Sequence, residues 1–174
     1  AFIVTQSIKK LSDTLKKAVF NDYDYKLLSD DTPITIEEMK NFDRHHPDNL
    51  ALYNDSAYKV VSADKVLDLG LYEDVVLKNG RTVQRKAKGV LKQRIIITFS
   101  RKMMEYQRTV RNRQIERAKK LLALKDPEEI KKGPNDVKRF MKRVSKTKSG
   151  EKVIVEYTLD ESKIAEEEKY DGYY

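Results

Sequence analysis

The sequence predicts an α+β fold in which a β-rich lobe with hairpins is combined with one long basic helix. Three observations lead to this fold class. β-Branched residues dominate residues 57–100, apolar residues recur at helical spacing over residues 100–124, and an Asn-Gly pair at positions 79–80 is typical of a tight hairpin turn. The length of 174 residues suits one domain, or one domain with an appended lobe.

The N-terminal part of the chain is expected to be mostly helical or irregular. Residues 2–7 read as a short strand, and the helical spacing of apolar residues from Ile8 to Val19 predicts an amphipathic helix directly after it. Thr35, with Glu38 three positions later, has the capping-box pattern and predicts a short helix through Met39. Pro47 is expected to end this helical segment.

β-Structure with hairpins is predicted over residues 57–100, and one hairpin turn can be placed within it. This turn is expected at Asn79-Gly80, as a two-residue turn that requires positive φ at both central positions. Ser100 is expected to cap a long helix that runs to about Leu124.

Shorter elements are expected after the long helix. Asn135 can cap a helix that continues through Met141. A second hairpin is predicted over residues 144–159, with its turn at Ser149-Gly150, and residues 161–170 read as an acidic helix or an irregular stretch.

Positive charge is concentrated in one stretch of the chain. The 36 Lys and Arg residues exceed the 28 Asp and Glu residues, so the net charge is +8. Residues 81–125 alone hold 15 Lys and Arg against two Glu, whereas residues 1–80 and 151–174 are both acidic. Two interpretations stay open: this basic block binds a polyanion such as DNA, or the acidic flanks of the same chain neutralise it.

Several classes of protein are disfavoured by what the sequence lacks. It contains no Cys, which excludes disulfides and thiolate zinc sites and favours a cytoplasmic protein. It contains neither an apolar run of about 18 residues nor a signal peptide pattern, so no membrane association is expected.

No catalytic or metal site is expected among these residues. The sequence has no Gly-rich phosphate loop, no His-Glu-x-x-His motif and no Gly-x-Ser-x-Gly motif. His45 and His46, flanked by Asp43 and Asp48, are interpreted as turn residues, because adjacent side chains point apart and a third strong ligand is not nearby. A free-standing enzyme is therefore the least favoured interpretation.

The basic block supplies the candidate DNA-binding residues. Arg111 follows Val110 on the apolar stripe of the helix, so it is expected to be half-buried. Met103, Met104 and Tyr106 could stack on a base, although packing within the helix is favoured for all three. The residues expected to contact DNA are Arg85, Lys86, Lys88, Arg101, Lys102, Arg108, Arg111, Arg113, Arg117 and Lys120.

Four strings in the chain resemble, in the same order, the bacterial insertion-sequence transposases of the DDE type that carry a Tyr-Arg-Glu-Lys signature. The strings are residues 2–10, 94–102, 113–118 and 166–174. The resemblance implies an RNase H-like core in which two Asp and one Glu hold two Mg²⁺ ions for cut-and-paste DNA cleavage and strand transfer. It also implies that this chain is the inserted region between the second Asp and the Glu, and that the parent protein continues beyond both ends.

The resemblance divides the chain into three parts. Residues 1–20 and 161–174 would be remnants of the catalytic core, and residues 21–160 would be an insertion domain. Glu116 and Glu167 lack the Tyr, Arg and Lys of the signature, and Glu105 has only its Arg, as Arg101. No Glu satisfies the signature, so no catalytic residue and no metal ligand is assigned to this chain.

DNA at the transposon ends is the partner that the resemblance implies, and a homodimer in the synaptic complex of the parent protein is a further expectation. In this interpretation the lobe positions DNA through its phosphates. The alternative is a structural or oligomerisation lobe without direct DNA contact.

Overall fold

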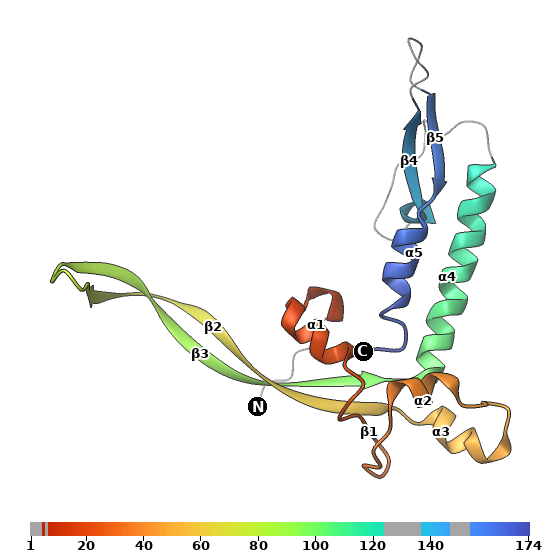
Figure 1. Ribbon diagram of the computed structural model, residues 1–174, viewed down its shortest axis with the longest axis horizontal. Coiled ribbons are helices and arrows are strands. Elements are labelled where there is room, and N and C mark those ends of the chain that lie inside the picture. The colour runs from red at the N-terminus through yellow and green to blue at the C-terminus, as the bar shows by residue number, and fades with distance from the viewer. Residues whose placement is uncertain (1–4, 6, 124–136, 147–153) are drawn as a thin grey trace.

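The computed structural model describes residues 5, 7–123, 137–146 and 154–174, and it has the predicted α+β fold. Figure 1 shows three parts: a small body, a long two-stranded ribbon that extends away from it, and an upright lobe. The elements are η1 (Ile8–Lys10), α1 (Asp13–Phe20), β1 (Lys26–Leu27), α2 (Ile36–Asn41), η2 (Pro47–Asn49), α3 (Leu50–Asn54), β2 (Ala57–Val76), β3 (Thr82–Phe99), α4 (Arg101–Leu122), η3 (Val137–Phe140), β4 (Met141–Lys146), β5 (Ile154–Leu159) and α5 (Glu161–Glu168), where η denotes a 3₁₀ helix.

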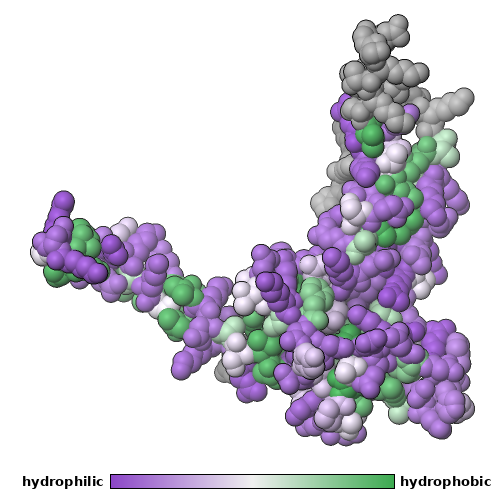
Figure 2. Space-filling view, viewed as in Figure 1, coloured by the Kyte–Doolittle hydropathy of each residue, from purple (hydrophilic) through white to green (hydrophobic). Residues whose placement is uncertain are grey.

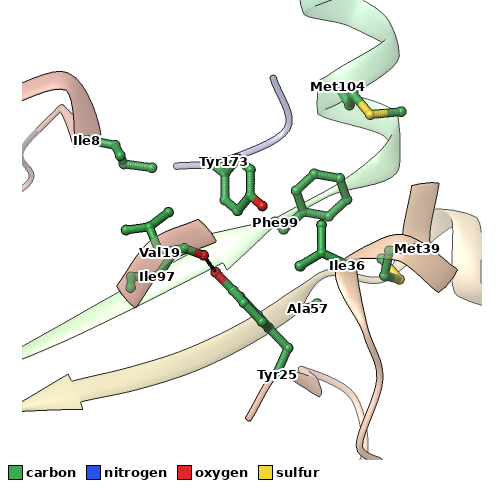
Figure 3. Packing of buried hydrophobic residues seen from close by; sticks show 10 residues of the cluster. All are labelled: Ile8, Val19, Tyr25, Ile36, Met39, Ala57, Ile97, Phe99, Met104 and Tyr173. Atoms are coloured by element: carbon green, nitrogen blue, oxygen red, sulfur yellow. Dashed lines mark hydrogen bonds between the residues drawn. The ribbon is translucent and has the colours of Figure 1, made fainter. Parts of the chain in front are cut away.

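The body holds the larger hydrophobic core, where the base of the ribbon meets α1, α2 and the start of α4 (Figure 3). Tyr25 is almost fully buried, and its hydroxyl donates a hydrogen bond of 2.7 Å to the carbonyl of Val19. Burial raises the pKa of Tyr25, because the phenolate form would lose its hydration. The core residues are Ile8, Val19, Tyr25, Ile36, Met39, Ala57, Ile97, Phe99, Met104 and Tyr173.

The N-terminal predictions are confirmed in part. The capping box of Thr35 and Glu38 is present in full, and α2 follows it. The helix expected to begin near residue 8 is instead a 3₁₀ turn followed by α1, because Ser12 caps a new helix by accepting a hydrogen bond from the amide of Leu15. Pro47 opens η2, and the strand expected before Ser7 lies mostly outside the described residues.

β2 and β3 form one antiparallel hairpin whose register pairs Ala57 with Phe99 at the base and Val76 with Thr82 near the tip. The turn was predicted at the correct place but with the wrong geometry. Of the two predicted turn residues, Asn79 and Gly80, only Gly80 has positive φ. The amide of Gly80 donates a hydrogen bond of 2.8 Å to the carbonyl of Leu77, which makes a three-residue loop in place of the two-residue turn. The register is interrupted between Asp68 and Tyr72.

The upright lobe consists of α4, α5 and the hairpin of β4 and β5, around a second, smaller core of Ala118, Phe140, Met141 and Ile164. The helix predicted to run from Asn135 through Met141 is wrong in its extent, because η3 ends at Phe140 and Met141 is the first residue of β4. The turn predicted at Ser149-Gly150 lies outside the described residues.

The C-terminal segment joins the lobe to the body. Tyr173 forms a bridge with Phe99, and the backbones of Thr98 and Tyr174 exchange two hydrogen bonds of 3.0 Å. Gly172 makes this approach possible: it has a φ of +83°, and a Cβ at this position would lie 2.5 Å from the ring of Phe99.

Candidate nucleic-acid interface

The predicted basic helix is confirmed as α4, and its ends follow from its sequence. The Ser100 side chain accepts a hydrogen bond from the amide of Met103, which caps the helix directly after β3. Met104, Arg111 and Ala118 are buried at intervals of seven residues, which defines the inner face of α4. Met104 therefore packs in the core, as expected.

Arg111, expected to be half-buried, is 5% exposed. Its guanidinium donates two hydrogen bonds to the Asp171 carboxylate, at 2.6 and 2.5 Å, and one of its nitrogens lies 3.5 Å from Glu168. The hydrogen bonds from Arg111 to Asp171 raise the pKa of Arg111. Arg108, which is half-exposed, lies 3.5 Å from the same carboxylate. In this structure Arg111 is therefore placed to hold the C-terminal segment and not to contact DNA.

A second cluster engages Arg101. The Arg101 Nε atom lies 2.8 Å from one oxygen of Glu105, and Arg44 and Tyr53 donate hydrogen bonds to the other oxygen. Burial opposes ionisation of Glu105, but these three hydrogen bonds outweigh it and lower the pKa of the carboxyl. Arg101 is thus engaged in an ion pair within α4, and Arg44 and Tyr53 tie the same carboxylate to the loop before η2 and to α3.

The outer face of α4 differs from the inner face. Lys102, Tyr106, Arg113, Arg117 and Lys120 are all exposed. At about 100° per residue, these five positions fall within an arc of about 60°, opposite Arg111. Within the described part of the chain, the four cations among them form no salt bridge. We call these five residues the outer stripe. Tyr106 is 64% exposed, so the prediction that it packs within the helix is wrong.

The three candidate residues on the ribbon have a different electrostatic environment. Arg85, Lys86 and Lys88 are exposed on β3, but the register places Glu73 opposite Arg85 and Asp68 opposite Lys88. The Lys86 ammonium also lies 2.9 Å from Asp68. Cross-strand pairing therefore balances charges that are separate blocks in the sequence.

A cavity of ≈ 620 Å³ lies between α4, α5 and the segment before η1. Its wall includes the rings of Tyr106 and Tyr170 and the guanidinium groups of Arg111 and Arg139. Arg139, which the sequence analysis did not select, lies 3.2 Å from Glu167 and donates a hydrogen bond to Gln114. Both guanidinium groups in this wall are therefore engaged in holding α5 against α4.

The residues in the described ranges do not fit the two-metal site that the transposase resemblance implies. No three His, Asp or Glu side chains among them lie close enough together to hold a metal ion. His46 accepts a hydrogen bond from the amide of Asp48 at the start of η2, and His45 accepts one from Arg44. These contacts agree with the interpretation of both histidines as turn residues.

No protein-family model, curated protein or solved structure matches this chain. In the described residues, no helix combines the length and the apolar character needed to cross a membrane.

Proposed function

We propose that this chain is the DNA-contacting part of a DDE-type transposase and that it holds duplex DNA against the outer stripe of α4. The observation that carries the proposal is the contrast between the two faces of the helix. Inner-face and flanking cations such as Arg111 and Arg101 are paired with carboxylates, whereas Lys102, Arg113, Arg117 and Lys120 share one exposed face with no salt bridge among the described residues. Such uncompensated positive charge is unfavourable unless a polyanion neutralises it.

The geometry of the outer stripe suits contacts with phosphates. From Lys102 to Lys120 the stripe covers about 27 Å along the helix, at a rise of about 1.5 Å per residue. Its cations offer Arg and Lys donors to phosphate oxygens, which position a duplex without reading its sequence. Tyr106 lies among them and presents an exposed ring to the same ligand.

Catalysis is assigned to other parts of the parent protein. The described residues offer no carboxylate set for divalent ions, so the two Mg²⁺ ions of a DDE transposase would be held by its core. In this proposal the chain positions DNA for that core.

A structural role is the second candidate, and it is supported by a different observation. Arg111 and Arg139 connect α4 and η3 to α5 and the C-terminal segment through Asp171 and Glu167. These contacts favour the interpretation that the acidic C-terminal flank of the chain neutralises the cations on the inner face of α4. The two candidates therefore divide between the two faces of the same helix.

The test is a titration of a fluorescent 20-base-pair duplex with the chain at several salt concentrations. Four phosphate contacts predict a slope of log affinity against log salt of about −3.6, or about a hundredfold loss of affinity between 50 and 200 mM salt. Replacing Lys102, Arg113, Arg117 and Lys120 together by Ala is expected to bring this slope close to zero.

A matched variant controls for net charge. It replaces four exposed lysines away from α4 by Ala, namely Lys10, Lys17, Lys26 and Lys78. This variant is expected to retain most of the slope. Equal weakening in the two variants, or unchanged binding after the loss of the outer stripe, would show that α4 is not the interface.

A further inference from the structure

The ribbon of β2 and β3 exposes large apolar side chains. Beyond the body it is a two-stranded structure with no further layer on it in the described residues (Figure 1). Isolated two-stranded ribbons are at best marginally stable in water. Nine large apolar side chains on the ribbon are exposed. Three of them, Leu69, Leu71 and Leu91, have odd numbers, and the other six, which are Val60, Val66, Tyr72, Val76, Val90 and Ile96, are between 41% and 68% exposed. Figure 2 shows apolar residues both midway along the ribbon and near its tip.

These six residues all lie on one face. Side chains alternate between the two faces of a strand, so residues with even numbers share a face on each strand. The register pairs even residues with even residues on both sides of the irregularity, as in Asp68 with Lys88 and Tyr72 with Lys86. We call this the even face of the ribbon.

The cross-strand pairs on the even face include both apolar pairs and charged pairs. Val60 lies opposite Ile96, and Val66 lies opposite Val90. Between and beyond these apolar pairs, Asp64 lies opposite Lys92 and Asp68 opposite Lys88. In both charged pairs the acid belongs to β2 and the base to β3, so the even face carries an acidic row beside a basic row.

This order makes the even face complementary to itself in one arrangement. When two ribbons stack face to face about a two-fold axis that runs along the ribbon, β2 of one copy lies over β3 of the other. Each residue of a cross-strand pair then faces its pairing partner in the other copy. Asp64 of one copy meets Lys92 of the other, and Val66 meets Val90. A two-fold axis across the ribbon would place β2 over β2 and would bring acids together.

We propose that the ribbon is a self-association arm and that its even face binds the even face of a second copy of this chain, with the two ribbons parallel. Residues 60–76 span about 55 Å at about 3.3 Å per residue, and two strands are about 10 Å wide. The stacked faces bury about 1,100 Å² in total, which reaches the lower limit for a specific interface. The acids of β2 repel phosphates, so this face suits a second copy better than DNA.

Two charge variants test the pairing without DNA, so that the outcome is independent of the proposed function. Asp64→Lys leaves two cations in the pair of residues 64 and 92, whereas Lys92→Asp leaves two acids. By sedimentation velocity the unaltered chain is expected to dimerise, and each variant alone is expected to dimerise at least about tenfold more weakly. An equimolar mixture of the two variants is expected to restore the dimer, because opposite charges then meet only between copies.

The mixture excludes loss of folding as the explanation, since misfolded variants would not recover when mixed. A monomeric unaltered chain at 100 μM, or a mixture that stays monomeric, would overturn the proposal. Chemical cross-linking then tests the direction of the ribbons, since the sequence contains no Cys. Stacked sheets lie about 10 Å apart, so a bismaleimide that spans about this distance is the suitable reagent. A mixture of Val66→Cys and Val90→Cys chains is expected to form mostly the mixed cross-linked dimer, whereas predominance of the two homodimeric products would refute the parallel arrangement.

Discussion

Replacing Arg111 by Ala tests whether this residue holds the fold together or binds DNA. Arg111 and Asp171 are both about 5% exposed, and the pair has two hydrogen bonds of 2.6 and 2.5 Å. Removing one partner of a buried ion pair costs about 3–5 kcal/mol, because the other charge stays buried without compensation. Arg108 still lies 3.5 Å from Asp171, so we expect the lower end of this range, about 3 kcal/mol.

Urea denaturation followed by circular dichroism measures this loss, with an unchanged dependence on denaturant showing that the unfolding transition is otherwise the same. In a thermal experiment the same loss corresponds to a decrease in Tm of about 6–12 °C for a chain of this size. Arg113→Ala is the matched control, since it removes an exposed Arg two positions away. We expect it to change stability by less than about 0.5 kcal/mol while weakening DNA binding.

A double variant separates charge from packing. Arg111→Met combined with Asp171→Leu replaces the ion pair by apolar side chains and is expected to be more stable than either single variant. The reasoning would be refuted if Arg111→Ala were no more destabilising than Arg113→Ala. It would also be refuted if Arg111→Ala lost DNA affinity while retaining full stability, which is the result that a phosphate contact would produce.

Two further changes address the junction between the body and the lobe. Gly172→Ala is expected to lower the free energy of unfolding by about 3 kcal/mol or more, because of the positive φ and the overlap with Phe99. Gly80→Ala is the control, since Gly80 has a φ of +77° but open space around it. Equal losses of stability in urea for the two variants would contradict the predicted overlap. Because the pKa of Glu105 is lowered on folding, its stabilisation is complete above its ordinary pKa of 4.5 and is lost as pH falls further. Glu105→Gln should therefore flatten the decrease in stability between about pH 5 and pH 3, and an unchanged acid profile would contradict this assignment.

Local chemistry explains the parts of the fold that the sequence predicted correctly. The capping box at Thr35, the cap at Ser100 and the place of the turn near Gly80 each depend on residues within a few positions of one another. Helical periodicity likewise indicated the basic helix. The prediction of positive φ at Asn79 was wrong, because a three-residue loop and a two-residue turn share the same Asn-Gly signal.

The candidate site was predicted only in outline, because charges far apart in the sequence meet in the fold. The basic block of residues 81–125 has a large excess of positive charge in the sequence, but β2 brings Asp68 and Glu73 beside its first cations. Arg111 finds Asp171 sixty positions away. The helical pattern placed Arg111 beside the apolar stripe, but no local pattern indicated that Asp171 is its partner.

The sequence by itself therefore determined the α+β class, the basic helix and the concentration of cations within it, since these follow from local periodicity, capping and composition. Only the tertiary structure decided which cations are neutralised and which remain exposed on the outer stripe. It also decided that six of the exposed apolar residues of the ribbon share one face, because this depends on the register between β2 and β3. The physical reason is that ion pairing and burial depend on distances between side chains, and strand pairing and helix packing set those distances across the whole chain.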